Sequence, residues 1–264
     1  MKVVPIRWPS TKELRMLINF IDKGLEVITH PAHGLLSGKI AEQVHSSFRL
    51  VNWLETITAI IEHDDEQLSP KQKNCISKIG KPLDFLNNTL PPEKSLQHAK
   101  AVFDKVLLKS SWSAMLLSHH LQFLYEDAAK DLDEFKEFLK GMKHFRKVTC
   151  ALHQVDTKEV ERLYQIMIFS DRLSLILCQN EIPLLGRELE INKSIAGKTY
   201  FIKELEDGSI TVRPWVFERD SFEISVDARL LKEIKFKNEK DFTEALARAA
   251  IYFKRWKFSK SERI

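Results

Sequence analysis

The sequence is organised around the stretch Ala59-Ile60-Ile61-Glu62-His63-Asp64-Asp65, where an apolar segment ends in two side chains that commonly bind metals. Before it, apolar residues recur at helical spacing, which predicts a helix over residues 50–64 with one face on a core. Asp64 falls on the continuation of that face. A carboxylate among apolar neighbours must be paired, protonated or bound to a metal, because burying it ionised and alone is too costly.

The composition is that of an ordinary globular protein, with 44% apolar and 30% charged residues in a chain of 264. The net charge of +4 is small for this length, so we expect no nucleic-acid partner. Three widely spaced cysteines indicate neither a disulfide framework nor a zinc finger. No stretch approaches the roughly 20 apolar residues of a membrane helix, and residues 1–10 lack the apolar run of a signal peptide. We therefore expect a cytoplasmic protein with no membrane partner.

Six helices and a hairpin are predicted before Pro183. Residues 16–20 and 25–29 are rich in β-formers, and Gly24 between them suits a hairpin turn. Apolar periodicity predicts helices over residues 31–46, 50–64, 93–109, 110–127, 131–154 and 158–178. The last of these is apolar nearly all round, so we expect a central buried helix, with Asp171 in its middle.

After Pro183 the pattern changes to a period of two residues. Residues 199–203, 210–213 and 222–226 read as strands, and Asp207-Gly208 as a turn between the first two. A final helix is expected over residues 239–252, with the basic and aromatic tail 254–258 as its frayed end.

These elements predict a mainly α fold, a helical bundle with a small antiparallel β-sheet. A hairpin alone is too small to be stable, so we expect it to join the later strands in one sheet packed on the bundle. The prediction is a single integrated domain over residues 1–264: a hairpin (15–29), the bundle (31–182), and the strands with a C-terminal helix (187–264).

Four side chains on apolar helix faces form a candidate metal site: His33, His63, Asp64 and Asp171. Neutral imidazoles and carboxylates are ligands that Fe, Mn, Zn and Ni accept in proteins. Each residue also has a simpler interpretation. A lone His33 on an apolar face is usually a hydrogen-bonded core histidine, and Asp171 could instead pair with Arg187.

The order His33…His63-Asp64…Asp171 resembles the HD-domain superfamily of metal-dependent phosphohydrolases. A bacterial HD-like family of unknown function is more closely similar, over roughly residues 15–260. The segments that carry this closer resemblance are Glu26-Val27-Ile28-Thr29-His30-Pro31-Ala32-His33, Glu62-His63-Asp64, Leu116-Leu117-Ser118-His119-His120 and Ser170-Asp171-Arg172-Leu173-Ser174-Leu175. The resemblance implies an HD-like helical bundle in which those four residues bind one metal and His120 helps to bind a second.

Departures from the family pattern concern the substrate more than the metal. Such proteins usually follow His-Asp with Gly-Trp, whereas Asp65-Glu66-Gln67-Leu68 follows here. The lysine that contacts phosphate in nucleotide-cleaving relatives is missing after the doublet. Position 30, commonly Gln, is His30.

We therefore expect a metalloenzyme that hydrolyses a phosphorylated small molecule with a metal-activated water. The expected catalytic residues are Glu62 or Asp65 as general base and Arg172 as a positive charge near the substrate. The expected substrate-binding residues are Lys39, His119 and His30.

Two alternatives stay open beside this hypothesis. One is a dinuclear iron oxygenase on the same fold, with His119 and His120 as extra ligands. The other is a non-catalytic domain that keeps the pocket for a small regulator or a partner protein. The sequence also leaves open whether the chain forms a homodimer.

Overall fold

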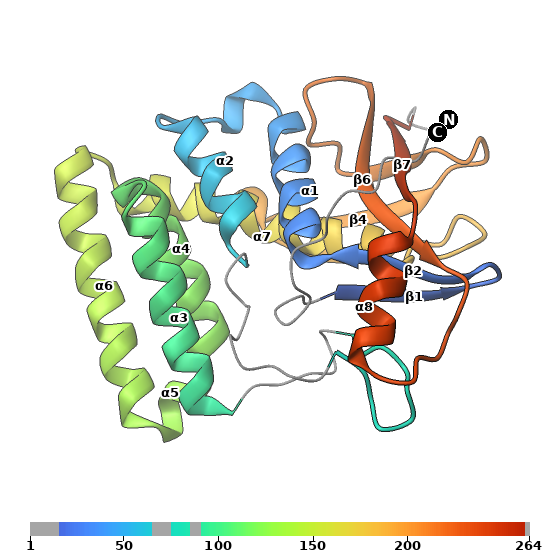
Figure 1. The fold of residues 1–264 in the computed structure, drawn as a ribbon. Helices are drawn as coiled ribbons and strands as arrows, with labels where there is room; N and C mark the ends of the chain where they lie inside the picture. The colour runs from blue at the N-terminus through green and yellow to red at the C-terminus, as the bar shows by residue number, and fades with distance from the viewer. Residues whose placement is uncertain (1–15, 65–74, 85–90, 262–264) are drawn as a thin grey trace.

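A curled seven-stranded sheet forms one side of the molecule and most of the helices form the other (Figure 1). The computed structural model describes residues 16–64, 75–84 and 91–261. Helices account for 51% of the structure and strands for 22%. The prediction of a mainly α bundle with a small antiparallel sheet is therefore wrong, because the sheet is a large half-barrel that contributes much of the core.

The strands lie in the order β1-β2-β6-β7-β5-β4-β3. Every neighbouring pair is antiparallel except β5 and β7, which are parallel. The strands span β1 Met16–Ile21, β2 Gly24–Thr29, β3 Leu189–Lys193, β4 Thr199–Glu204, β5 Ile210–Arg213, β6 Ser221–Leu231 and β7 Ile251–Ser259. The predicted hairpins at Gly24 and at Asp207-Gly208 are confirmed, and the first hairpin joins the later strands through β2 and β6.

The segment after residue 250 was wrongly predicted as the end of a helix, and it forms the last strand. Helix α8 (Glu239–Arg248) ends earlier than expected, and the supposed frayed tail is strand β7, in the middle of the sheet. Its side chains alternate in exposure, with Arg255 and Lys257 outward and Trp256 and Phe258 more buried. The mixture of basic and aromatic residues is thus the period-two pattern of a half-exposed strand. Strand β3 was not predicted.

The predicted helices before Pro183 are all present, with small shifts at their ends. They span α1 His30–Gln43, α2 Trp53–Glu62, α3 Pro92–Leu107, α4 Ser111–Tyr125, α6 Asp133–His153 and α7 Thr157–Cys178, with a short α5 Ala128–Asp131 and 3-10 turns at Ser46–Phe48 and Ile195–Gly197. Thr29 caps α1, and the side chains of Asp156 and Glu159 form a capping box on α7.

Helix α7 is the central buried helix that its composition predicts. Apolar side chains from most of its circumference, among them Leu163, Phe169 and Ile176, are fully buried. Phe169 packs edge-on against Tyr200 of β4, with ring centroids 5.1 Å apart. Helices α1 and α7 therefore lie between the sheet and the outer helices, and both contribute to one hydrophobic core with it.

A buried polar network fastens the sheet to the end of α7. Glu26 of β2 is only 5% exposed and accepts hydrogen bonds from Asn19, Tyr252 and Lys254. Asn19 also donates to the carbonyl oxygen of Cys178 at 2.6 Å, and Lys254 donates to Asn180 at 2.7 Å. Three strands and the end of a helix are thus held by one satisfied carboxylate.

None of the helices in the described part of the chain is both long enough and apolar enough to span a bilayer.

The Glu26 network predicts a large difference between two lysine variants. Lys254→Ala leaves Glu26 buried without its cation and should lower the free energy of unfolding by about 3 kcal/mol. Lys260→Ala is the control, because Lys260 pairs with Asp220 on the surface at 2.9 Å and both side chains are more than half exposed. Its loss should stay below about 1 kcal/mol. Urea denaturation measures both, and equal small losses would show that the network does not stabilise the fold.

Candidate metal centre

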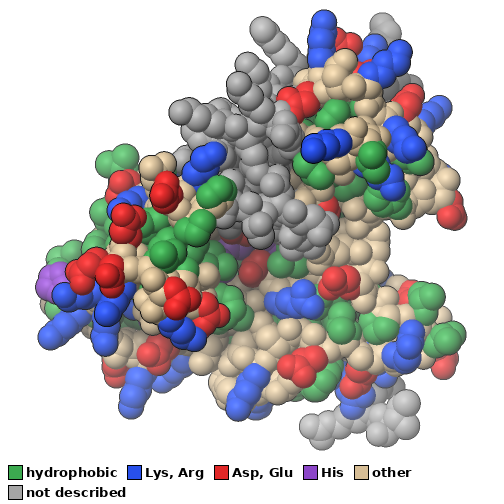
Figure 2. All heavy atoms as spheres, turned by 90° about the horizontal axis from the view of Figure 1, so that it is seen from below, with side chains coloured by type: hydrophobic (Ala, Val, Ile, Leu, Met, Phe, Trp, Pro, Cys, Tyr) green, Lys and Arg blue, Asp and Glu red, His purple; other side chains and the backbone are tan. Residues whose placement is uncertain are grey.

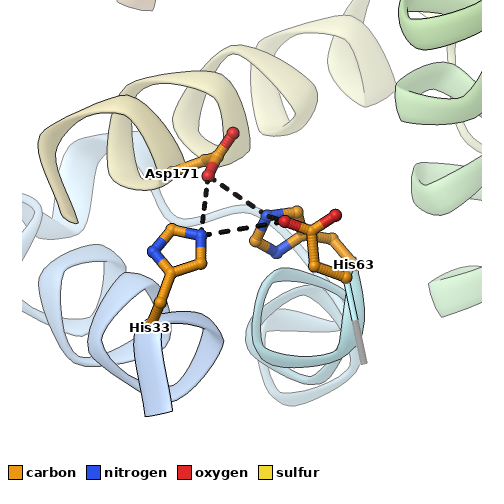
Figure 3. Close-up of side chains that lie close together, drawn as sticks. His33, His63 and Asp171 are labelled. Carbon is orange, nitrogen blue, oxygen red and sulfur yellow. Dashed lines mark ion pairs between the residues drawn. The ribbon is translucent and has the colours of Figure 1, made fainter. Parts of the chain in front are cut away.

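Three helices bring four potential ligands to one point. His33 projects from α1, His63 caps the end of α2 with Asp64 directly after it, and Asp171 projects from α7. One side-chain nitrogen or oxygen of each lies within 4.8 Å of the others. Figure 3 shows His33, His63 and Asp171 pointing toward one another. In the view from below, histidine and acidic side chains are visible in the middle of the face (Figure 2).

The distances between the four ligand atoms suit a single ion. Asp171 Oδ1 lies 3.1 Å from Nε2 of His33 and 3.2 Å from Nε2 of His63. Asp64 Oδ2 lies 3.1 Å from Nε2 of His63 and 3.8 Å from Nε2 of His33. Ligands about 2.1 Å from a metal stand about 3 to 4 Å apart, so these separations match a shared first-row ion.

Hydrogen bonds on the far side of each ring orient both histidines. His63 Nδ1 donates to the carbonyl oxygen of Ile60 at 2.7 Å. His33 Nδ1 lies 2.7 Å from Ser174 Oγ, which itself donates to the carbonyl oxygen of Asp171 at 2.8 Å and so accepts from the ring. Both rings therefore direct Nε2 to the centre, as in histidines that bind metals with a hydrogen-bonded outer nitrogen.

A close approach of α1 and α2 brings His33 and His63 together. A Cβ atom on Gly34 would lie 2.3 Å from the carbonyl oxygen of Ile61, and one on Gly38 would lie 2.4 Å from the Ile61 side chain. Only glycine permits this contact, which sits beside His33 on one helix and two residues before His63 on the other. The spacing of the two glycines, one helical turn apart, is the sequence signal from which this helix contact could have been predicted.

The atoms at the centre need a positive partner. His33 Nε2, His63 Nε2 and Asp171 Oδ1 are buried, and within the described residues their polar contacts are with one another and with Asp64. When the imidazoles are neutral, these three atoms are acceptors that face one another. A proton on each ring or a shared cation would satisfy them, so the donor set fits a divalent metal ion.

Without a metal, the centre would hold protons. Burial lowers the pKa of His63, but the charges of Asp64 and Asp171 outweigh burial and raise that pKa to about 10. Burial likewise lowers the pKa of His33, but hydrogen bonds to both carboxylates outweigh burial and raise that pKa well above its ordinary value. Burial raises the pKa of each aspartate, but the histidines outweigh it and hold both pKa values well below the usual range.

Two further histidines flank the centre. His30 Nε2 lies 3.5 Å from Asp64 Oδ2, and its ring centroid lies 5.5 Å from that of His33. His120 of α4 is 4% exposed and stands perpendicular to the His63 ring at 5.0 Å. The structure thus places the predicted residues His30 and His120 at the edge of the cluster.

The remaining predicted site residues lie elsewhere. His119 stacks on Tyr164 at 5.3 Å, and burial and Arg146 lower its pKa to about 4. Glu62 pairs with Lys109. The other two side chains contact atoms away from the centre. Arg172 pairs with Glu181 at 3.6 Å, and Lys39 donates a hydrogen bond to the carbonyl oxygen of Ser225 at 2.7 Å. Asp65 lies outside the described residues.

Some residues around the centre were not foreseen, chiefly Ser174 and Tyr164. Ser174 follows Asp171 by three residues, so it lies on the same face of α7 and could have been found by helical spacing. Nothing local distinguishes Tyr164, because its neighbours come from α4.

The fold and the centre define a protein of helices and a curled sheet that carries a candidate metal site. Residues 16–233 match the family described as "Protein of unknown function (DUF3891)", and the chain belongs to that family. The match includes every member of the four-residue cluster and agrees with the expected closeness to a family of unknown function. Neither a curated protein nor a solved structure gives a significant match.

The helix contact predicts opposite effects of two glycine substitutions. Gly34→Ala should force α1 and α2 apart, destabilise the fold by about 1–3 kcal/mol and weaken metal binding about 10-fold or more. Gly141→Ala is the control, because a Cβ atom there meets nothing within 4 Å in helix α6. That variant should be up to about 1 kcal/mol more stable and bind metal like the wild type. Thermal melting and metal titration provide the readouts, and normal metal binding by Gly34→Ala would refute the role of the contact.

The raised pKa of His63 predicts how pH acts on the metal-free protein. A folded pKa of about 10 against an ordinary value of 6.5 means that the stabilising contribution is complete below pH 6.5 and is lost as the pH rises to 10. In chelator, the melting temperature should therefore fall between pH 6.5 and 9 more in the wild type than in His63→Gln. Added metal needs the neutral imidazole, so its stabilisation should grow over the same range. His45→Gln, on the surface, should keep the wild-type slope.

Proposed function

We propose that this protein is a metal-dependent hydrolase of a phosphorylated small molecule. The observation that carries the proposal is the cluster of His33, His63, Asp64 and Asp171, with both Nε2 atoms directed to one point. Two imidazoles and two carboxylates suit Fe, Mn, Zn or Ni.

The resemblance to the HD-domain superfamily supports the phosphohydrolase assignment. The chain order His33…His63-Asp64…Asp171 is the order of metal ligands in that superfamily, and these residues lie together although up to 138 positions separate them. The departures after Asp64 leave the phosphate-contacting groups to other parts of the chain.

A bound divalent ion lowers the pKa of a water and polarises a phosphoryl oxygen. The protein's own contribution is to hold the ligands rigid and to keep them out of bulk water. Electrostatic interactions are stronger in the protein interior than in water. Ser174 and the carbonyl oxygen of Ile60 fix the two rings, and Asp64 and Asp171 supply the negative charge that retains the ion.

His120 lies on the α4 side of the cluster, where it can donate a hydrogen bond to a phosphoryl oxygen. Its ring contacts that of His63, and burial, followed in the metal-free protein by the charge of His63, lowers its pKa. Glu62, the candidate general base within the described part of the chain, pairs with Lys109. His30 lies on the Asp64 side of the cluster, where it can contact the phosphoryl group.

The oxygenase alternative requires a second set of ligands. His120 lies beside the centre, but His119 turns to Tyr164, so the structure brings only one of the two proposed extra histidines to the cluster. The number of metal ions per chain separates this alternative from a mononuclear hydrolase.

Metal content and turnover test the proposal together. Protein purified without chelator should contain about one Fe, Mn, Zn or Ni per chain and should release phosphate from a panel of phosphate monoesters, with activity lost in chelator and restored by metal. Asp171→Asn should lose most of the ion and the activity while keeping its circular dichroism spectrum, because a neutral amide holds a cation less well than a carboxylate. Asp220→Asn, on the surface, should behave as the wild type.

Two results would contradict the proposal. Protein that is metal-free and cannot be reconstituted would end the metalloenzyme interpretation. Protein that binds metal but turns over no ester would instead favour the non-catalytic alternative.

A further inference from the structure

We propose that Tyr164 and Phe123 form a subsite for the organic part of the substrate, in which the Tyr164 hydroxyl donates a hydrogen bond to the ester oxygen. This inference rests on the proposed function, since it names residues that bind the leaving group of the same phosphate ester. It also specifies the substrate class: a phosphate monoester whose leaving group carries an uncharged ring.

Helix α7 presents Tyr164 on the face that carries Asp171. The two residues are seven positions apart, which is about two helical turns, so they differ by only about 20° around the helix axis. Burial is the main cause that raises the pKa of the Tyr164 phenol, and the negative charge of Asp171 is the second. Tyr164 therefore stands near the metal centre along the helix that supplies one ligand.

Aromatic side chains of helix α4 lie between the metal centre and Tyr164. The His120 ring lies 5.0 Å from that of His63, 6.5 Å from that of Tyr164 and 6.4 Å from that of Phe123. His119 stacks on the Tyr164 ring, with centroids 5.3 Å apart, and fixes the plane of the phenol. A ligand that begins at the metal centre and extends past His120 thus meets Tyr164 and Phe123 next.

The Tyr164 hydroxyl is a hydrogen-bond donor without an acceptor among the described residues. Its oxygen is buried and makes no hydrogen bond to any described residue. A buried polar group left unpaired destabilises a protein by about 1–3 kcal/mol, so such a group indicates a ligand. Because burial and Asp171 raise the pKa of Tyr164, the phenol keeps its proton and acts as a donor, not as an acid.

The surroundings of the phenol favour an uncharged ring over a second phosphate. The nearby cation, Arg146, donates instead to the carbonyl oxygen of Ser118 at 2.8 Å and to Gln122. Phe123 is 58% exposed, so it offers a free aromatic face beside His120. Aromatic faces bind flat or cyclic groups, whereas phosphates need cations or clustered donors.

Two phosphate esters and one phosphonate test the subsite in the metal-loaded protein. During hydrolysis, water attacks phosphorus, the bond to the ester oxygen breaks, and negative charge collects on that oxygen. Tyr164→Phe removes the hydrogen bond to it, so kcat/KM for phenyl phosphate should fall about 10- to 100-fold. The loss should be about threefold for 4-nitrophenyl phosphate, whose leaving oxygen carries less charge.

Phenylphosphonate provides a readout that needs no turnover. It has the ring but lacks the ester oxygen, so its dissociation constant, measured by calorimetry, should be unchanged in Tyr164→Phe. In Phe123→Ala the same constant should rise about 3- to 10-fold, because the aromatic contact is lost. Tyr200→Phe is the matched control, since that buried hydroxyl donates to the carbonyl oxygen of Ile195 away from the centre. It should leave all three quantities unchanged.

The outcomes distinguish this inference from the function on which it rests. Equal losses for both esters, or no loss, in Tyr164→Phe would overturn the role of Tyr164 while hydrolysis by the wild type stands. Unchanged phenylphosphonate binding in Phe123→Ala would overturn the role of Phe123. A metal-loaded wild type that neither hydrolyses the esters nor binds the phosphonate would overturn the proposed function and the subsite with it.

Discussion

The contact between α1 and α2 at Gly34, Gly38 and Ile61 is the constraint on which the rest of the arrangement depends. Strand β2 ends at Thr29, and α1 begins at the next residue, so the position of α1 is fixed by the sheet at one end. Helix α1 also packs against α2 and α7, which position the remaining ligands. A displacement of α1 by the width of one methyl group would therefore move His33 relative to both His63 and Asp171.

Two buried groups of charges in this protein differ in how they are satisfied. Glu26 has donors from three directions, including a lysine, and its pKa is lowered because burial is outweighed by Lys254 and its other partners. The cluster of His33, His63 and Asp171 has its acceptors turned inward, toward one another. The first group is complete within the protein, and the second becomes complete only with a cation or with protons. That difference separates a network that stabilises the fold from one that binds something.

Local patterns in the sequence were enough for the helices, the two hairpins and the four residues of the candidate centre. They were enough because apolar periodicity and turn residues act within a few positions, and because His and Asp are conspicuous on apolar faces. The size of the sheet was not foreseen. Strand β7 pairs with residues about 30 positions earlier on one side and about 48 positions earlier on the other, and nothing local in its sequence encodes those partners. Ser174 and Tyr164 were missed for a related reason, since their significance depends on side chains from other helices.

The place of β7 has a consequence for how the protein reaches its native state. Strands β1, β2 and β6 lie on one side of it, and β5, β4 and β3 lie on the other, so the sheet consists of two separate pieces until β7 inserts. On the ribosome, β7 emerges after all the other strands, and until then β5 and β6 each present an unpaired edge. Closure of the sheet is therefore a late step with long-range pairing, which makes folding slow and leaves the nascent chain dependent on protection from aggregation.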